Sequence, residues 1–535
     1  MTGPRTEPTT RSGIPLKTSY EAVDVSDRML ERPGEYPFTR GRLTRPGAAA
    51  GGWIHRELSG EGGPAQSNRQ LHYLLEHGQA GLDVIGDGPT QSMLDADHPL
   101  CRHSVGTQGV SLCRLSDYAG LFAGIPLDQV SISSSVPAAF ALTGLIHAAE
   151  QAEMPLGRLR GSVLQPPLYA NDAAYDSFMP ISLASRLSVD TIAFCAEHLP
   201  KFHSYVEDTY FFSEGGLSAI EELALGFVQI RHLVGQTLAR GIPIDSFASR
   251  IALLVNCSMD FFEEIAKIRA ARRLFATMMR TDYGATDPRS LSLNVTSHTS
   301  GLTLTAEQPI NNVVRGTVQG LALALAGVQA MEISAFDEGF RTPSPEAHVV
   351  GLRTQQIIEK ESGVTRSSDP LGGSHLVESL TDEIESRVLA MVHEIESLGD
   401  PIELAERGHF RQIFTNAAVR YQHQVESGEL QIVGKNCYRM SDEDDRLLRD
   451  IAETKIEPDR DRIAEIAAFR KSRSNDDVVR QLRVVLASVG DPEANLIPAV
   501  LDAGNAGATM GEIAGAMRQA HGHPFDPLGY LKSPL

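Results

Sequence analysis

The chain has 535 residues, enough for one large barrel with additions or for roughly two to four ordinary domains. It carries 48 Lys and Arg against 68 Asp and Glu, a formal net charge of −20. This excludes a general nucleic-acid-binding surface but not a local basic pocket for a phosphate. A hydrophobic content of 42% excludes wholesale disorder.

Three features that the sequence lacks bear on where in the cell the protein is expected. The longest apolar runs, such as residues 320–331, are too short to cross a bilayer. The N-terminus lacks the apolar core of a secretory signal. The five cysteines form no CxxC pair, which favours reduced thiols. The expectation is a cytoplasmic protein that neither enters a membrane nor binds nucleic acid.

Residues 1–35 are rich in Pro, Thr and Arg and are predicted to form an N-terminal arm. From residue 36 to 400 short apolar runs alternate with longer helical stretches, which predicts βα units around a parallel sheet. The predicted strands are 81–87, 130–135, 291–295 and 330–336, and the predicted helices are 116–125, 137–152, 216–241 and 259–284. Roughly eight such units favour a (β/α)8 TIM barrel over an open sheet.

The remainder, residues 401–535, is predicted to be a helical C-terminal extension, in which the charged stretch 441–463 forms a solvated linker. Just before it, DPLGGS at 369–374 is a Gly-rich loop ahead of a helix. Such a loop can cradle a phosphate, although a tight turn is favoured on local chemistry alone. No metal site is predicted, because no His, Cys or acidic group has ligand spacing.

Several short sequence motifs, in a fixed order along the chain, resemble those of a known family. They are SNRQLHYLLEHGQAGLDV (67–84), PTQ and DADHP (within 89–99), FFEEIAKIRAARRLF (261–275), TSGLTLTAEQPINNVVRGTVQ (299–319), FDEG (336–339) and DPLGGS. Together they resemble the barrel subunit of the adenosylcobalamin-dependent acyl-CoA mutases, the methylmalonyl-CoA mutase family, over about 90% of the chain. The resemblance implies a (β/α)8 barrel capped by cobalamin at its C-terminal mouth, with an acyl thioester threaded along its axis.

The resemblance also implies how the cofactor is held. The family's cobalamin-binding domain carries a DxHxxG motif, and this motif is missing from the sequence. The expected partner is therefore a separate small cobalamin-binding subunit, in a heterotetramer or around a homodimer of barrels. The residues expected to face adenosylcobalamin are Thr90, Gln91, Glu214, Gly215, Gly301, Glu338, Gly339 and Pro343.

The substrate pocket departs from the family pattern. Where the family has SGYHxxEAG, this chain has DTYFFSEGG at 208–216, so Tyr210 is kept and Phe211 replaces a His. Apolar or small residues also replace a Tyr, a Gln and two Arg, and the positions are Leu58, Leu164, Ala174 and Asn294. Because a buried carboxylate without a cation costs several kcal/mol, a methylmalonyl or succinyl substrate is not expected.

Two hypotheses follow. The first is the large subunit of an adenosylcobalamin-dependent mutase for another acyl thioester, with Tyr210, Phe211 and His298 as the candidate catalytic residues. The alternative for His298 is a buried structural histidine. The second hypothesis is a catalytically silent barrel that serves as a structural partner of an active mutase.

Overall fold

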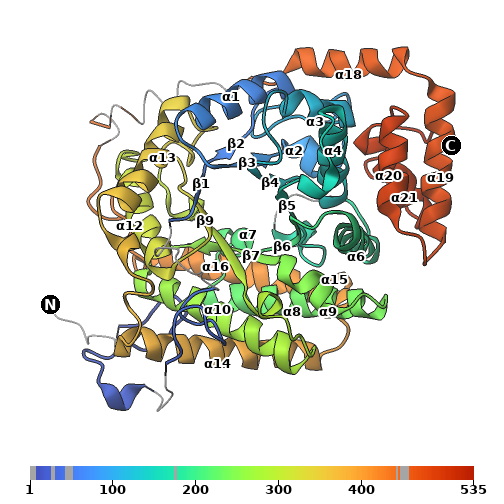
Figure 1. Ribbon diagram of the computed structural model, residues 1–535. Coiled ribbons are helices and arrows are strands. Elements are labelled where there is room, and N and C mark those ends of the chain that lie inside the picture. Colours follow the sequence, from blue (N-terminus) through green and yellow to red (C-terminus); the bar gives the residue numbers. More distant parts are fainter. Residues whose placement is uncertain are drawn as a thin grey trace.

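The computed structural model describes residues 8–25, 30–42, 52–173, 177–441, 444–445, 447 and 457–535. A ring of strands forms its centre, and helices surround the ring (Figure 1). The strands are β1 Ile54–Arg56, β2 Leu58–Ser59, β3 Gly81–Ile85, β4 Ser131–Ser135, β5 Gly161–Leu164, β6 Phe202–Asp208, β7 Ile251–Cys257, β8 Asn294–Thr299 and β9 Ala330–Glu332.

The helices fall into two groups along the chain. Those of the barrel are α1 Pro64–Glu76, α2 Gly88–Gln91, α3 Leu115–Leu121, α4 Ala138–Gln151, α5 Ala170–Ala173, α6 Ile181–His198, α7 Tyr210–Glu214, α8 Ala219–Ala239, α9 Ile244–Phe247, α10 Phe261–Thr281, α11 Pro288–Leu291, α12 Asn311–Ala326, α13 Pro345–Lys360 and α14 His375–Ser397. Those after the barrel are α15 Pro401–Glu406, α16 His409–Ser427, α18 Arg460–Ser472, α19 Asn475–Gly490, α20 Leu496–Asn505 and α21 Met510–Ala520. None of these helices has the length and apolarity to cross a bilayer.

The sheet closes on itself. Its order is β1-β9-β8-β7-β6-β5-β4-β3-β2, and every neighbouring pair is parallel. β1 and β2 are consecutive pieces of one segment, separated only by Glu57. Together they act as a single strand, which pairs with β9 through its N-terminal part and with β3 through its C-terminal part and so closes the barrel. The predicted (β/α)8-type barrel is confirmed, whereas the proposed domain boundaries at residues 35 and 400 stay predictions.

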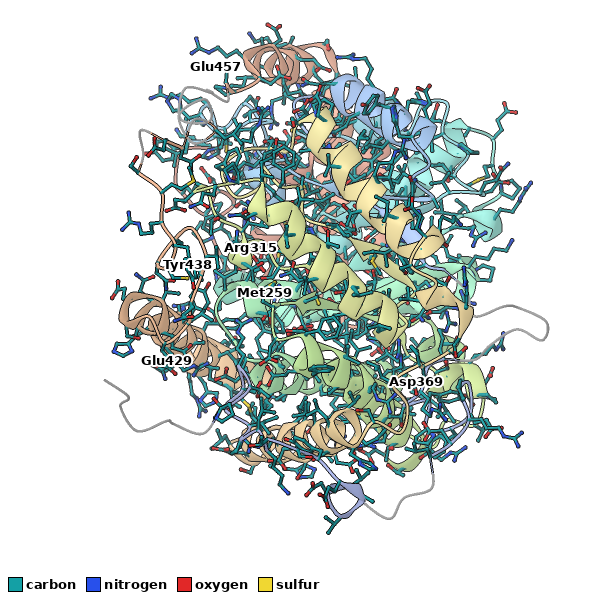
Figure 2. All side chains as sticks on the ribbon, turned by 90° about the vertical axis from the view of Figure 1, so that its left-hand side faces the viewer. Met259, Arg315, Asp369, Glu429, Tyr438 and Glu457 are labelled. Atoms are coloured by element: carbon teal, nitrogen blue, oxygen red, sulfur yellow. The ribbon has the colours of Figure 1, made fainter. Side chains whose placement is uncertain are left out.

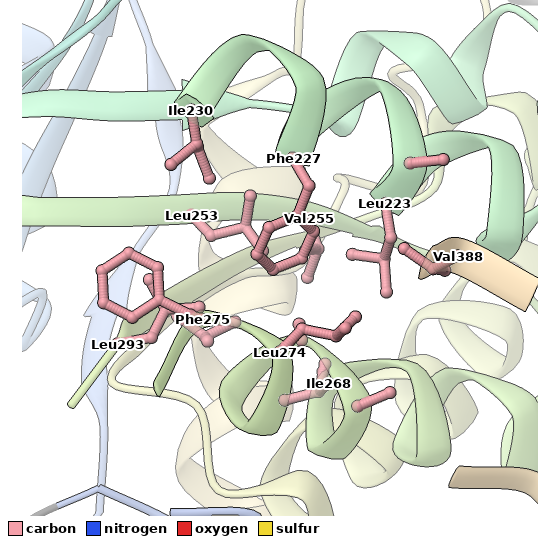
Figure 3. Packing of buried hydrophobic residues seen from close by; sticks show 14 of the residues in the cluster. Leu223, Phe227, Ile230, Leu253, Val255, Ile268, Leu274, Phe275, Leu293 and Val388 are labelled. Carbon is pink, nitrogen blue, oxygen red and sulfur yellow. The ribbon is translucent and has the colours of Figure 1, made fainter. Parts of the chain in front are cut away.

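Each strand buries both faces, as expected of a parallel barrel. On β7, Leu253 and Val255 point outward into a core shared with α8, α10 and α14, where Figure 3 shows them beside Phe227 and Phe275. The alternate residue Leu254 belongs to a different apolar cluster inside the barrel. The outer core fixes the strands, and the inner residues are left to line the lumen.

The C-terminal helices complete the burial of the barrel on one side. Figure 1 shows α20 and α21 on the side of α4 with α19 outside them, and α20 contacts both α4 and α6. Helix α4 is consequently apolar around most of its surface, with Phe140, Leu142 and Leu145 all buried. Most of the predicted solvated linker, residues 442–443, 446 and 448–456, lies outside the described residues. The prediction is wrong at the C-terminal end of the linker, because α18 begins at Arg460 and the Arg462 guanidinium is buried against Asp117.

The Gly-rich loop 369–374 forms the turn that local chemistry favours. Asp369, labelled in Figure 2, accepts hydrogen bonds from Arg40 Nε (2.7 Å) and Arg269 (2.6 Å). The backbone N–H of Gly373 donates to Glu378 Oε1 in α14 (2.9 Å). A carboxylate-rich turn of this kind joins the barrel to α14 and offers no cradle for a phosphate.

Candidate active site at the C-terminal mouth

Four βα loops bring most of the candidate residues to one end of the barrel. Gln91 lies in α2 after β3, and α7, which holds Tyr210 and Glu214, follows β6. Gly301 follows β8, and Glu338 follows β9. Because the carboxyl ends of parallel strands meet at the same mouth, these residues share one face, which is where (β/α)8 barrels carry out their chemistry.

A stacked aromatic pair forms the floor of this mouth. The rings of Tyr210 and His298 lie 4.7 Å apart at an interplanar angle of 14°. Ser334 Oγ donates to the carbonyl of Thr299 (2.6 Å), so His298 Nε2, 3.1 Å from that oxygen, is the donor of its hydrogen bond. Burial lowers the pKa of His298 to about 4, so the ring is neutral near pH 7.

This shift gives a testable pH dependence of folding. Between pH 6.5 and 4 the unfolded chain binds a proton on His298 and the folded chain does not, so the free energy of unfolding falls as the pH falls. In His298→Gln the loss between pH 7 and pH 5, measured by denaturant titration, should be smaller by about 2 kcal/mol. His423→Gln, at an exposed position of α16, is the matched control and should leave the loss unchanged. An unaltered pH profile in His298→Gln would contradict the buried neutral ring.

Glu214 is held in place by a network below the mouth. Asn256 Nδ2 (2.6 Å) and Ser300 Oγ (2.7 Å) both donate to Glu214 Oε1, and burial raises the pKa of this carboxyl. The N-terminal arm secures the same loop, because the Arg11 guanidinium donates to the carbonyl of Leu217 (3.0 Å). The short helix α7 is thus fixed from both sides.

Glu338 lies partly exposed at the mouth, where its Oε2 accepts the backbone N–H of Ala335 (3.0 Å). Desolvation, and to a lesser degree the charge of Glu214, raises the pKa of Glu338 to about 7. This carboxyl can therefore hold or release a proton near neutral pH. Gly339 beside it is exposed, and Pro343 is half-buried.

The structure turns Thr90 away from the mouth. Its hydroxyl oxygen accepts the backbone N–H of Leu112 (3.0 Å), and the residue is 1% exposed. The amide of Gln91 donates to the carbonyl of Ser135. Both side chains hold neighbouring loops, and Gly215 belongs to the turn that ends α7.

One wall of the reaction pocket is apolar. Phe211 packs on a cluster of inward-facing residues, namely Leu164, Val206, Tyr210, Ala252 and Leu254. Leu58 on β2 is half-buried and stands opposite Asp83 in register. Asn294 lies elsewhere: it begins β8, four residues and therefore about 13 Å below His298 along the strand. Ala174 lies outside the described residues.

The sequence analysis missed a group of buried carboxyls, of which Asp83 and Glu332 belong to β3 and β9, while Asp208 ends β6 and lines the same cavity as Phe211. Burial, together with the charge of Asp83 and a hydrogen bond to it, raises the pKa of Glu332 well above its usual range. Asp83 Oδ1 and Asp208 Oδ1 are buried without a hydrogen-bond partner, and burial raises the pKa of Asp208 to about 7. The signal was an Asp and a Glu placed inside apolar strand runs, GLDVI and AMEIS.

The opposite, N-terminal mouth is basic. A cavity of about 220 Å³ there is lined by the strand starts and by Arg56, Arg160, Lys201 and His203. Asn294 and Thr296 of β8 line it as well. In a chain with a net charge of −20, this cluster is a local exception and is suited to phosphate groups. No group of three or more His, Cys, Asp or Glu among the described residues is placed to hold a metal ion.

These features define a (β/α)8-barrel protein with a cluster of buried aromatic and carboxyl groups at the C-terminal mouth and a basic cavity at the other end. The sequence profile of the methylmalonyl-CoA mutase family matches residues 9–523. The chain therefore belongs to this family, whose members are mutases, enzymes of the isomerase class.

Individual relatives agree with this assignment. The chain is 34% identical over 510 residues to the 2-hydroxyisobutanoyl-CoA mutase large subunit of Aquincola tertiaricarbonis, covering 94% of this chain and 89% of that one. It is 33% identical over 520 residues to methylmalonyl-CoA mutase of Cereibacter sphaeroides, covering 96% of this chain and 72% of that one. For the mitochondrial methylmalonyl-CoA mutase of Homo sapiens the identity is 31% over 521 residues, covering 96% and 68%.

Proposed function

We propose that the chain is the large subunit of an adenosylcobalamin-dependent mutase that rearranges an acyl-CoA thioester without a free carboxylate. The observation that carries the proposal is the contrast between the two walls of the reaction pocket and the basic cavity below it. The neutral Tyr210–His298 stack and the apolar cluster around Phe211 form one wall, and the carboxyls of Asp83 and Glu332 form the other.

The two ends of the barrel suit the two ends of a CoA thioester. The basic cavity at the N-terminal mouth offers Arg160 and Lys201 to the phosphates. Small and polar inward residues, such as Ser131, Ser162 and Ala252, leave room along the axis from this cavity. The acyl group would then lie near the neutral ring of His298, whose Nε2–H is donated to Ser334 Oγ and whose Nδ1 carries no proton.

The residues at the C-terminal mouth suit a large group that caps it. Glu338 and Gly339 come from the loop after β9 and Gly301 from the loop after β8, and all three are at least partly open to the outside. When bound, adenosylcobalamin would supply the homolytic, radical chemistry that a 1,2-rearrangement requires. The chain's own part is to hold the substrate against the mouth, to exclude water with Tyr210 and Phe211, and to present the neutral ring of His298, fixed by Ser334 and by its stacking on Tyr210.

The substrate class follows from charge. The relative from Aquincola tertiaricarbonis is named for 2-hydroxyisobutanoyl-CoA, whose acyl group carries no free carboxylate. The same class fits this pocket, because Leu58, Leu164 and Phe211 offer a carboxylate no donor and the carboxyls opposite would repel it.

The name "large subunit" of that relative also supports a separate small subunit as the partner, with a cobalamin-binding DxHxxG motif. We place this assembly, a heterotetramer built on a pair of barrels, in the cytoplasm. The buried thiols of Cys101, Cys113, Cys195 and Cys257 are consistent with a reducing compartment.

The proposal is tested by reconstitution. The 535-residue chain alone should bind adenosylcobalamin weakly, because it can contact the cofactor from one side only. Adding a small subunit with the DxHxxG motif should give stoichiometric binding, followed by ultraviolet–visible titration, and isomerisation of branched acyl-CoA thioesters. Tight, stoichiometric binding by the single chain would overturn the shared-cofactor assembly. Binding by the pair without turnover of any thioester would indicate a silent barrel.

A further inference from the structure

A side chamber opens from the reaction pocket between α4 and α6. It is a cavity of about 130 Å³ beside the ends of β4 and β5. Its main apolar lining consists of Val136, Phe140, Leu164, Met179, Leu187 and Phe211. Two of these residues, Leu164 and Phe211, also belong to the apolar wall of the reaction pocket, so the chamber and the pocket share that wall.

The polar groups around the chamber are mostly engaged with the protein itself. The amides of Gln91 and Gln165 donate to the backbone carbonyls of Ser135 and Ser204. Ser188 Oγ donates to the carbonyl of Ala184 (3.1 Å). Asp208 also lines the chamber, and its Oδ1 is buried without a hydrogen-bond partner. An apolar group that enters the chamber leaves the two amides and the hydroxyl satisfied, which lowers the cost of filling it, and it would pack beside the Asp208 carboxyl, whose pKa burial raises to about 7.

The chamber also lies within reach of the reacting group. The ring of Phe211, at its edge, is 5.5 Å from the ring of Tyr210, and Tyr210 stacks on His298. A substituent on the carbon next to the thioester carbonyl, held near His298, would point at this opening. The side of Asp83 and Glu332 suits such an apolar substituent less well, because it carries two buried carboxyls and the unpartnered Oδ1 of Asp83.

We propose that this chamber binds an alkyl branch of the acyl group, about four to six carbon atoms long. An apolar cavity of about 150 Å³ holds a benzene-sized molecule, and the chamber is slightly smaller. The inference rests on the proposed acyl-CoA mutase function and narrows its substrate class to 2-methylacyl-CoA thioesters with a medium-length branch. Isobutyryl-CoA would bind but leave the chamber empty.

The test is equilibrium binding to the full chain with its small subunit, measured by calorimetry. The probes are isobutyryl-, 2-methylbutanoyl-, 2-methylhexanoyl-, 2-methyloctanoyl- and 2-methyldecanoyl-CoA. Affinity should rise about fourfold for each added methylene, because each buried methylene contributes roughly that factor, and should level off at about four to six carbons. An affinity that stays flat or falls along the series would overturn the proposal.

Variants separate the chamber from the rest of the pocket. Ala184→Phe, which fills the chamber from α6, should abolish the gain with branch length and keep isobutyryl-CoA binding within about twofold. Ala196→Phe, at an exposed position of the same helix, is the matched control. Leu187→Ala enlarges the chamber and should move the plateau to a longer branch. Equal losses for all thioesters in Ala184→Phe would contradict the assignment.

Turnover, followed in parallel, distinguishes two kinds of failure. If the long-branched thioesters bind as expected but none is isomerised, the proposed mutase function fails and the chamber assignment stands. If isobutyryl-CoA is isomerised but affinity does not depend on branch length, the chamber assignment fails and the mutase function stands.

Discussion

Methylmalonyl-CoA should be a very poor substrate of the reconstituted enzyme, with kcat/KM about a thousandfold or more below that of isobutyryl-CoA. The free carboxylate of methylmalonyl-CoA would enter a pocket with Leu164 and Phe211 on its apolar wall and Leu58 beside Asp83, and none of these three apolar side chains can donate a hydrogen bond. On the other side it would face Asp83 and Glu332, so the pocket adds repulsion to the cost of desolvation.

Two arginines are the candidates for a rescuing cation: Arg160 lies at the N-terminal cavity, whereas the charge of Arg56 already acts on Glu332 and partly offsets the rise of its pKa. Arg56 lies opposite Glu332 in register and donates to Ser131 Oγ (3.0 Å). Arg56 and Arg160 both line the N-terminal cavity. Neither lies among the residues that form the wall around Phe211.

The assay compares methylmalonyl-CoA and isobutyryl-CoA in the same preparation. Asp83→Asn with Glu332→Gln removes the negative charge that this hydrogen-bonded pair carries, at nearly constant volume, and should raise kcat/KM for methylmalonyl-CoA by about tenfold relative to that for isobutyryl-CoA. Glu394→Gln, at an exposed position of α14, is the control. Efficient conversion of methylmalonyl-CoA by the unaltered enzyme would show that the carboxylate finds a cation that this pocket geometry does not include.

The barrel was predictable from the sequence because its outward residues are apolar and its helices are long. The boundaries were less predictable, since the inward residues of several strands are polar. The strand predicted at 291–295 actually runs from Asn294 to Thr299. Thr296 and His298 face the lumen, and these polar residues interrupt the apolar run on which the strand prediction was based. In the same way β6 ends in Glu207 and Asp208, two buried carboxyls that do not resemble a strand in hydropathy.

The candidate site residues were predictable only where the sequence matches motifs of the family that it resembles. Tyr210, Glu214 and Glu338 do meet at one mouth. The pairing of Asp83 with Glu332 depends on strand register across β1, β2, β3 and β9, which residue spacing does not reveal. The height of Asn294, about 13 Å below His298, likewise depends on where β8 begins.

The buried triad beneath the mouth should be among the most sensitive positions for stability. Lys267 is fully buried, and its Nζ lies 2.9 Å from Glu222 Oε2 and 2.5 Å from Glu264 Oε2. The two carboxylates raise the pKa of Lys267, so the amine stays charged at neutral pH although burial opposes the charge. Its third hydrogen bond is to the carbonyl of Asn256 (2.7 Å), and this asparagine in turn donates to Glu214 at the mouth.

Lys267→Met should therefore lower the free energy of unfolding by about 3–5 kcal/mol, because it leaves two buried carboxyls without their cation. The measurement is the shift of the denaturant midpoint, with Lys360→Met at a 70% exposed side chain as the control that should change little. Adding Glu222→Gln and Glu264→Gln should recover part of the loss, since neutral amides remove the unpaired charge. The triple variant should still lose activity, because Asn256 no longer has the lysine that holds its backbone and Glu214 loses its fixed position. A small midpoint shift and full activity in Lys267→Met would contradict this prediction. That result would show that the buried charge of Lys267 does not hold the residues at the mouth of the barrel.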